Sequence, residues 1–363
     1  MTNYLKPITP KQQVLPTFST EVVLMSEDQP ANDEPFYKVE TQTYLASFVS
    51  SVASEVIFNA MKNSHKSAGS ELVENVIIQG DVGVGKSVLC RKYANKYPSH
   101  ILEDTVIMPV IYLQLPQSAT DTDIVNGLLE VLCNKLNFIG SGKKNLSRLI
   151  MQLNAAHTRF IIIDEAQNID HTHRGNDVSQ VIKSLSYIQD KTRIPFAFSC
   201  THDFFSMLER LKQVGIKKVK KIEVDKLILD SNVTGSEKNA ALAFIRRTRN
   251  TVNFPSFKFY TKHWGDVLNE CWQYFPRDSS FKDLPMLNER IFIATQGRLG
   301  FVTKLLKEVL EITESNSQID LKDFSKAIRN CTMKPPCGFD PFEATDPKVT
   351  SHMQKIVKAR EKR

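Results

Sequence analysis

Residues 80–87 read Gly-Asp-Val-Gly-Val-Gly-Lys-Ser and follow the apolar run at 76–78, which is the setting of a phosphate-binding loop. The glycines let backbone N–H groups turn toward phosphate oxygens, and the helix that follows adds its positive N-terminal end. Lys86 supplies a charge for the β- and γ-phosphates, and Ser87 offers a hydroxyl to Mg²⁺. The motif therefore predicts nucleotide binding. The predicted contacts are Gly80, Asp81, Val82, Gly83, Val84, Gly85, Lys86, Ser87 and Val88.

A pair of acids, Asp164 and Glu165, follows a second apolar run at 160–163. Parallel strands end at one edge of a sheet, so we expect this pair beside the phosphate-binding loop. There Asp164 can hold Mg²⁺, and Glu165 can polarise the water that attacks the γ-phosphate. Asp164 follows Lys86 by 78 residues, and the strand expected at 110–115 lies between the two motifs. This arrangement favours an ATPase, with ATP and Mg²⁺ as cofactors, over a small-molecule kinase, in which the glutamate is usually missing.

A further strand is expected at 194–199, and it leads into Ser199, Cys200 and Thr201. A polar group at this strand tip can lie between the γ-phosphate and the catalytic acid and report which nucleotide is bound. We select Thr201 for that role. Thr201 is also a suitable N-cap for a helix starting near Asp203, and the two roles are compatible.

Apolar runs and helical periodicity alternate along the middle of the chain. Such alternation predicts an α/β fold with a parallel, doubly wound sheet. The expected strands lie at 76–78, 110–115, 159–164, 194–199 and 219–224, giving a five-stranded sheet in a three-layer αβα sandwich. One helical segment is expected from Tyr44 to the polar loop near Ser64 to Ser70, and further helices are expected at 84–97, at 123–136 and from Asn145 onward.

Beyond the sheet the pattern becomes helical and predicts a C-terminal helical lid. The helices of this lid are expected at 237–249, 282–296, 299–312 and 320–330. The resulting domain boundaries are an extended arm at 1–40, the nucleotide-binding α/β domain at 41–230, the lid at 231–332 and a flexible tail at 333–363.

Composition narrows the class of protein. The 363 residues carry a net charge of +7, which permits a nucleic-acid partner without requiring one. Six scattered cysteines are typical of reduced thiols in a cytoplasmic protein. Cys331, Cys337 and His352 lack the paired short intervals of zinc sites. No run of 18 apolar residues is present, so we expect a cytoplasmic protein without a membrane partner.

The order of elements resembles an AAA+ P-loop ATPase and, more narrowly, the TniB/TnsC family of transposition regulators, over about residues 40–330. Residues 80–87 and the string Ile-Asp-Glu-Ala-Gln-Asn at 163–168 carry the resemblance to AAA+ proteins. The strand from Ile194 to Thr201, the string Gly-Arg-Leu-Gly at 297–300 and the string Asp-Pro-Phe-Glu at 340–343 favour the transposition family.

This resemblance implies an ATPase that oligomerises as rings or filaments on duplex DNA, through backbone contacts without sequence specificity. It also implies that the protein links a target-selection protein, similar to TniQ, to transposase subunits, and that ATP hydrolysis clears the assembly. Hydrolysis is expected to be slow and switch-like.

Family members often place a trans-acting arginine after the fourth strand, where it stabilises the charge on a neighbour's γ-phosphate. Arg210 is the only arginine in that region, and the lysines at 212–221 are the alternatives. Arg298 is the expected lid arginine for the nucleotide, although it follows Gly297 directly whereas many AAA+ lids place it later.

Loops that face a central channel in this family contact DNA phosphates through basic, hydroxyl or amide groups. The matching candidates here are Thr120, Lys143, Lys144 and Arg174. Each of the charged ones also suits a solvated surface position. The basic C-terminal tail suits a contact to DNA or to the acidic face of a partner, for which the resemblance favours a transposase subunit, or else a solubilising end. The acidic N-terminal arm poses the same choice for a target-selection protein.

Two other functions remain open at this point. One is an AAA+ nucleotide switch or loader in replication or signalling, without a transposase partner. The other is a small-molecule phosphotransferase, which the pair Asp164 and Glu165 disfavours.

Overall fold

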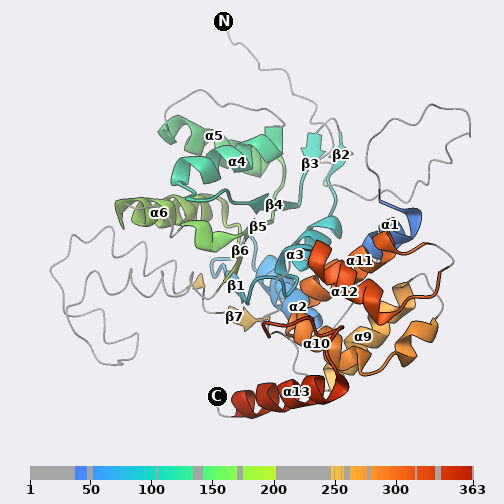
Figure 1. Cartoon of the computed structure of the whole chain (residues 1–363). Coiled ribbons are helices and arrows are strands. Elements are labelled where there is room, and N and C mark those ends of the chain that lie inside the picture. The colour runs from blue at the N-terminus through green and yellow to red at the C-terminus, as the bar shows by residue number, and fades with distance from the viewer. Residues whose placement is uncertain are drawn as a thin grey trace, which may run out of the picture. The chain divides into compact units, whose positions relative to one another are not determined.

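The computed structural model describes the chain in two compact units (Figure 1). The α/β unit comprises the described residues of Val56–Val82 and Lys86–Phe254, and the helical unit comprises those of Pro16–Glu55, Gly83–Gly85 and Pro255–Arg363. The described residues are 37–46, 52–103, 105–133, 142–169, 175–201, 247–248, 250–254, 256, 262–275, 279–314, 317–331 and 337–361.

A five-stranded sheet in the order β4-β5-β6-β1-β7 forms the centre of the α/β unit, and all its neighbouring strands are parallel. Its strands are β1 (Val76–Gln79), β4 (Val110–Gln114), β5 (Phe160–Asp164), β6 (Phe196–Cys200) and β7 (Asn250–Asn253). The predicted α/β fold and four of the predicted strands are therefore confirmed. The expected strand at 219–224 lies outside the described residues.

The fifth strand of the sheet is β7, which corrects two expectations. The α/β unit extends to Phe254 rather than ending at 230, and the chain is already a strand at Asn250, directly after the helix expected at 237–249. Thr251 and Val252 pair with Ile77 and Ile78 of β1. The strand β7 is a four-residue edge strand that begins and ends with asparagine. It therefore lacks the long apolar run that marks β5 in the sequence.

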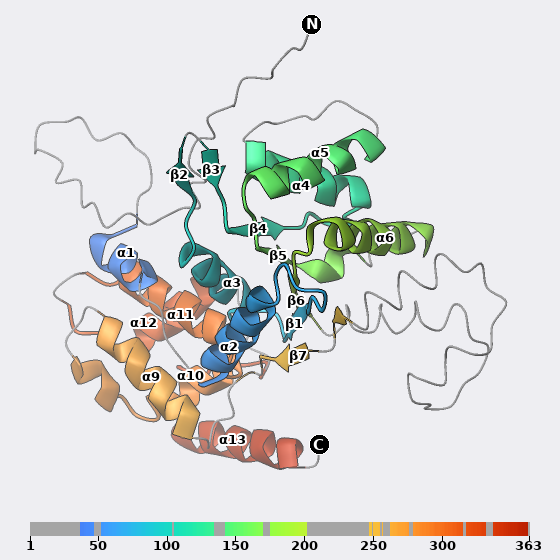
Figure 2. The ribbon, with the colours of Figure 1, turned by 180° about the vertical axis from the view of Figure 1, so that it is seen from behind.

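Helices cover both faces of the sheet (Figure 1). On one face, His65 of α2 (Val52–Lys66) and Tyr93 of α3 (Lys86–Asn95) pack against Phe160, and Figure 2 shows these two helices beside each other. On the other face, α4 (Asp121–Cys133), α5 (Gly142–Ala155) and α6 (Gly175–Thr192) share one apolar core with the strands. Burial on both faces explains why β5 is apolar at successive positions.

A small antiparallel hairpin of β2 (His100–Leu102) and β3 (Thr105–Ile107) also belongs to the α/β unit. Its Ile101 and Leu102 are exposed, and the sequence pattern did not predict it. A short 3₁₀ helix, η1 (Ala166–Ile169), follows β5 directly and shapes the candidate site described below.

The helical unit consists, among described residues, of seven elements around a second apolar core. They are α1 (Val39–Ala46), α9 (Lys262–Tyr274), η3 (Ser279–Asp283), α10 (Leu287–Thr295), α11 (Leu299–Ile312), α12 (Leu321–Asn330) and α13 (Asp346–Glu361). The helices predicted at 299–312 and 320–330 correspond to α11 and α12. The one predicted at 282–296 begins later, at Leu287, because η3 occupies the preceding residues.

Residues 337–361 are folded, which corrects the flexible tail expected from 333 onward. Phe342, Val349 and Met353 are buried in the core of the helical unit. The side chain of Arg290 donates to the Ala344 carbonyl oxygen at 2.9 Å and to Asp346 Oδ1 at 2.5 Å. This segment is rich in charged residues, Pro and Gly, and only a few apolar side chains anchor it to the core. Its sequence therefore carries no clear signal of folded structure.

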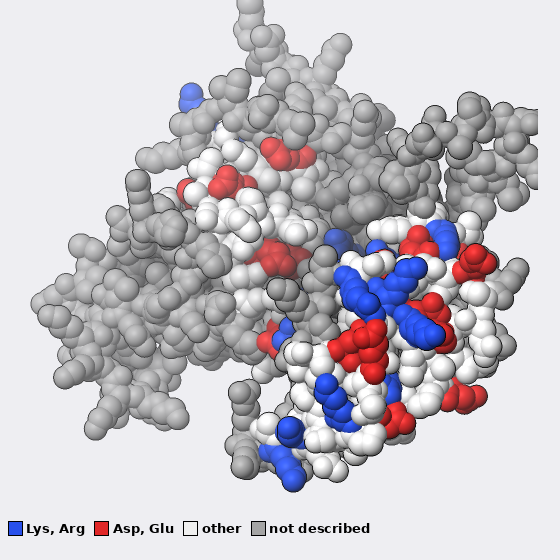
Figure 3. All heavy atoms as spheres, in the orientation of Figure 1, with Lys and Arg blue, Asp and Glu red and all other residues white. Residues whose placement is uncertain are grey.

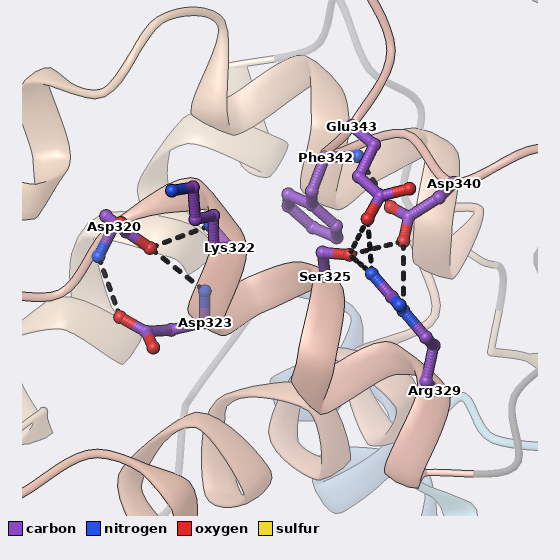
Figure 4. A network of polar contacts seen from close by, with 8 residues as sticks. All are labelled: Asp320, Lys322, Asp323, Ser325, Arg329, Asp340, Phe342 and Glu343. Atoms are coloured by element: carbon purple, nitrogen blue, oxygen red, sulfur yellow. Dashed lines mark hydrogen bonds and ion pairs between the residues drawn. The ribbon is translucent and has the colours of Figure 1, made fainter.

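A second set of contacts fixes the turn before α13 (Figure 4). The Ser325 hydroxyl of α12 donates to Asp340 Oδ2 at 2.7 Å, and Arg329 pairs with Glu343. Phe342 packs its ring on Phe324, with ring centroids 5.2 Å apart. The string at 340–343 therefore holds the C-terminal segment to α12.

Candidate nucleotide-binding site

The phosphate-binding loop joins β1 to α3 and has the backbone that its glycines permit. Gly83 and Gly85 have φ angles of 80° and 105°, in the region that other residues rarely adopt. A Cβ on Gly80 would lie 2.4 Å from the Phe254 carbonyl oxygen. The glycines at these positions are thus required by conformation and by close packing, and the strand, loop and helix follow one another as predicted.

Lys86 is the first residue of α3 and is 8% exposed. Its Nζ donates to the carbonyl oxygens of Gly80 at 2.7 Å and Asp81 at 2.9 Å. Burial lowers the pKa of Lys86, and the charges of Glu165 and Asp164 oppose that shift. An anionic phosphate would offer this lysine a stronger acceptor than the two carbonyl groups.

Asp164 ends β5 and is 1% exposed. Its Oδ2 accepts a hydrogen bond from the Tyr112 hydroxyl at 2.7 Å, and its Oδ1 accepts one from the backbone N–H of Glu165 at 2.9 Å. Burial, followed by the charge of Asp164, raises the pKa of Tyr112 well above its usual value of 10.0. Tyr112 therefore remains a neutral donor that orients the carboxylate, a role that strand spacing alone did not reveal.

Glu165 and Thr201 come together through a residue that the sequence did not single out. Gln167, in η1, donates from Nε2 to Glu165 Oε2. The Oε1 atom of Gln167 accepts from the backbone N–H of Thr201 at 3.1 Å. The structure thus links the end of β5 to the end of β6, as the parallel sheet predicted.

The hydroxyl oxygen of Thr201 is buried and has no hydrogen-bond partner among the residues that the structure describes. A buried hydroxyl without a partner is costly and calls for an explanation, such as a ligand, an ion or a water. A nucleotide phosphate or its attacking water would supply a partner at this strand tip. The helix expected to start near Asp203, which Thr201 would cap, lies outside the described residues.

Two buried thiols lie close enough to Lys86 and Asp164 to interact with their charges. Cys90 and Cys200 are free and fully buried, and burial raises the pKa of Cys200 to about 12. They remain uncharged thiols, as expected of reduced cysteines. Among described residues no group of three or more His, Cys, Asp or Glu side chains could hold a metal ion.

Arg298 belongs to the helical unit and occupies the N-cap position of α11. Its guanidinium lies over the Phe301 ring, 5.5 Å from the centroid. In the same unit the backbone N–H of Gly300 donates to the Gly83 carbonyl oxygen at 2.7 Å, so the start of α11 contacts the tip of the phosphate-binding loop.

Of the predicted DNA contacts, Thr120 and Lys144 can be placed. The Thr120 hydroxyl caps α4 by accepting from the backbone N–H of Asp123 at 3.3 Å, and it donates to Asp123 Oδ2 at 2.7 Å. Lys144 is exposed near the start of α5, a helix that also includes Lys143. Arg174, and Arg210 of the predicted trans-acting site, lie outside the described residues. Figure 3 shows basic and acidic side chains interleaved on the described part of one face. That part of the surface therefore shows no continuous basic patch of the kind that would indicate a DNA-binding site.

A family model described as bacterial TniB protein matches residues 43–226, just over half of the chain. The chain belongs to the TniB family. As a member of this family it is an AAA+ P-loop ATPase with a role related to transposition or DNA, and the predicted family is confirmed. The matched range includes both the phosphate-binding loop and the pair Asp164 and Glu165.

Solved structures of archaeal proteins share the fold of this TniB family member. The CDC6P protein of Pyrobaculum aerophilum is 15% identical, with a TM-score of 0.54 over 80% of this chain and 70% of that one. The ORC1 protein of Aeropyrum pernix, solved in complex with DNA, is 14% identical, with a TM-score of 0.53 over 80% and 69%. No curated protein sequence gives a significant match. None of the described helices is long and apolar enough to span a membrane.

Proposed function

We propose that this TniB family ATPase binds ATP through residues 80–88 and hydrolyses it with Glu165 as the residue that polarises the attacking water. The observation that carries the proposal is the linked set Glu165, Gln167 and Thr201 at the carboxyl edge of a sheet whose phosphate-binding loop carries Lys86. Thr201 serves as the group that reports the γ-phosphate. Its buried hydroxyl without a described partner supports this role.

Ser87 and Asp164 would hold Mg²⁺, which would supply positive charge to offset the negative charge of the phosphates. The donors fit a hard cation, since one is a hydroxyl and the other a buried carboxylate. Tyr112 keeps that carboxylate oriented. Arg298 of the helical unit is proposed as the lid contact of the nucleotide, and Arg210 as the residue that a neighbouring subunit supplies.

At the level of assembly, we propose that ATP-bound subunits form a ring or filament on duplex DNA. The assembly would link a TniQ-like target-selection protein to transposase subunits and would come apart after slow hydrolysis. Membership of the TniB family supports this role. Thr120, Lys143, Lys144 and Arg174 are the proposed contacts to the DNA backbone. Such contacts would make binding fall steeply with salt.

Electron microscopy with a long DNA duplex, comparing ATP with ADP, tests the assembly. Rings or filaments that form only with ATP and DNA support the proposal, whereas a monomer under all conditions contradicts it. A pull-down with the transposase and the target-selection protein then separates two functions. Assembly on DNA without either partner would favour a nucleotide switch or loader.

Glu165→Gln tests the chemistry of the same site. This variant should bind ATP but hydrolyse it slowly, so that the ATP-bound assembly persists on DNA. Glu130→Gln, at a partly buried position of α4, is the matched control and should behave as wild type. If the Glu165→Gln assembly decays as fast as the wild-type one, Glu165 is not the hydrolytic residue.

A further inference from the structure

We propose that Gln167 is a positioning residue for ATP hydrolysis, because it holds the Glu165 carboxylate and couples it to the tip of β6. This inference rests on the proposed role of Glu165. Gln167 lies two residues after Glu165 and is 9% exposed, so its amide is largely removed from water. A buried amide needs partners for both its oxygen and its nitrogen.

The two ends of the Gln167 amide have complementary partners. Its Nε2 donates to the Glu165 carboxylate, and its Oε1 accepts from the backbone N–H of Thr201 at 3.1 Å. The side-chain amide of glutamine offers both the donor and the acceptor that these two partners need. A glutamate at this position would face the Glu165 carboxylate with a second negative charge, and a methionine would leave both partners without a hydrogen bond.

The backbone around Gln167 fixes where its amide can reach. Glu165 has a φ of 57°, a left-handed conformation that a residue other than glycine adopts only at a cost. The N–H of Asn168 donates to the Glu165 carbonyl oxygen at 2.9 Å and closes this turn. The Asn168 side chain in turn donates to the Leu115 carbonyl oxygen at 3.1 Å, which ties the turn to the residue after β4.

Gln167 thereby connects two groups that are expected to respond to the γ-phosphate. A shift of Thr201 when nucleotide binds would alter the hydrogen bond to Gln167 Oε1, and the amide would pass this change to Glu165. We therefore expect Gln167 to affect the rate of hydrolysis and not the affinity for ATP.

Two substitutions test the inference in the full chain with ATP and Mg²⁺. Gln167→Met keeps the length of the side chain and removes both hydrogen bonds. We expect kcat to fall about tenfold, because a modest loss of transition-state stabilisation lowers the rate by about that factor. Gln167→Glu keeps the acceptor for the Thr201 N–H but repels Glu165, and kcat should fall further. The Kd of ATP should stay within about twofold of wild type, a split that separates positioning from binding.

A matched control comes from another buried glutamine of the α/β unit. Gln189 of α6 donates to Asn75 Oδ1 at 2.6 Å, beside the start of β1 and away from the strand end that carries Thr201. Gln189→Met should lower the stability of the fold and leave kcat unchanged. If it lowers kcat as much as Gln167→Met does, the effect of Gln167 is structural and the inference is wrong.

Combining the variants shows whether Gln167 acts through Glu165. In a Glu165→Gln background, Gln167→Met should lower kcat no further, because the group that it positions is already lost. An additive loss would overturn the inference, as would a wild-type kcat for Gln167→Met alone. If Gln167→Met does not fold, Gln167→Glu carries the test. Wild-type hydrolysis by Glu165→Gln would instead contradict the proposed function itself.

Discussion

The Tyr112 hydroxyl of β4 donates to Asp164 Oδ2 of β5 at a distance of 2.7 Å, and both side chains are buried. The register of the two strands places Gln114 opposite Asp164, so Tyr112 lies two positions earlier on the neighbouring strand. A hydrogen bond to a buried charged group contributes more than a neutral one. Tyr112 therefore stabilises the ionised carboxylate that is proposed to hold Mg²⁺.

Tyr112→Phe removes this hydroxyl and keeps the ring. We expect a loss of about 1.5–3 kcal/mol in the free energy of unfolding, the range for a hydrogen bond to a charged group. Hydrolysis should also require more Mg²⁺ for half-maximal rate, because the carboxylate is less well oriented. A urea titration and a Mg²⁺ titration of kcat measure the two effects.

The control for Tyr112→Phe is Tyr187→Phe, since Tyr187 of α6 is 44% exposed. That variant should match wild type in both measurements. An unchanged Mg²⁺ requirement in Tyr112→Phe would show that the hydroxyl stabilises the fold without orienting the metal-binding carboxylate.

Lys86→Ala should weaken ATP binding. The lysine charge is held over the phosphate-binding loop by the carbonyl groups of Gly80 and Asp81. Hydrogen bonds to a charged group contribute about 1.5–3 kcal/mol, so the Kd of ATP should rise about 10- to 100-fold. Isothermal titration calorimetry with ATP measures the change. Lys62→Ala, at an exposed position of α2, is the control for lost positive charge, and an equal loss in both variants would contradict the assigned role.

The parts of the structure that could be predicted are those whose signal is local. The phosphate-binding loop is specified by glycines at fixed spacing, and β5 by four consecutive apolar residues that are buried on both faces. The helix α11 shows its buried face through Val302, Leu305 and Val309, which recur at helical spacing. Physical constraints on a few neighbouring residues suffice in each case.

The missed parts depend on contacts between distant residues. The strand β7 is recognised only by its pairing with β1, and α13 buries only Val349 and Met353 among its described side chains. The partner of Asp164 is set by strand register, and the contacts of Gln167 are set by a left-handed turn at Glu165. Neither relationship has a signature in the order of residues.

The stability of the α/β unit should depend on pH through His65. Burial, with a smaller contribution from Arg159, lowers the pKa of His65 from 6.5 to about 4. The unfolded chain therefore takes up a proton before the folded protein does, and stability is lost as the pH falls from 6.5 toward 4, while nothing is lost above 6.5. Because the ring is only partly buried, we expect a loss of about 1 kcal/mol.

Urea unfolding followed by circular dichroism across this pH range measures the His65 effect. His65→Phe keeps the ring that stacks on Phe160, with centroids 5.1 Å apart, and should flatten the dependence over this interval. His100→Phe, at an exposed position of β2, should retain the wild-type dependence. If His65→Phe loses as much stability as wild type between these pH values, another group is responsible.

Arg290 should prove the main anchor of the C-terminal segment. Its side chain is 3% exposed and donates to Asp346 Oδ1 and to the carbonyl oxygens of Pro285, Pro341 and Ala344. Arg290→Met removes the hydrogen bonds of a buried guanidinium, and we expect a loss of about 1.5–3 kcal/mol. Trp264 and Trp272 both lie in α9, so their fluorescence during urea unfolding reports on the helical unit.

Arg329→Met is the control for Arg290→Met, because the Arg329 side chain is 63% exposed and its ion pair should contribute about 0–1 kcal/mol. Equal losses in the two variants would contradict the anchoring role of Arg290.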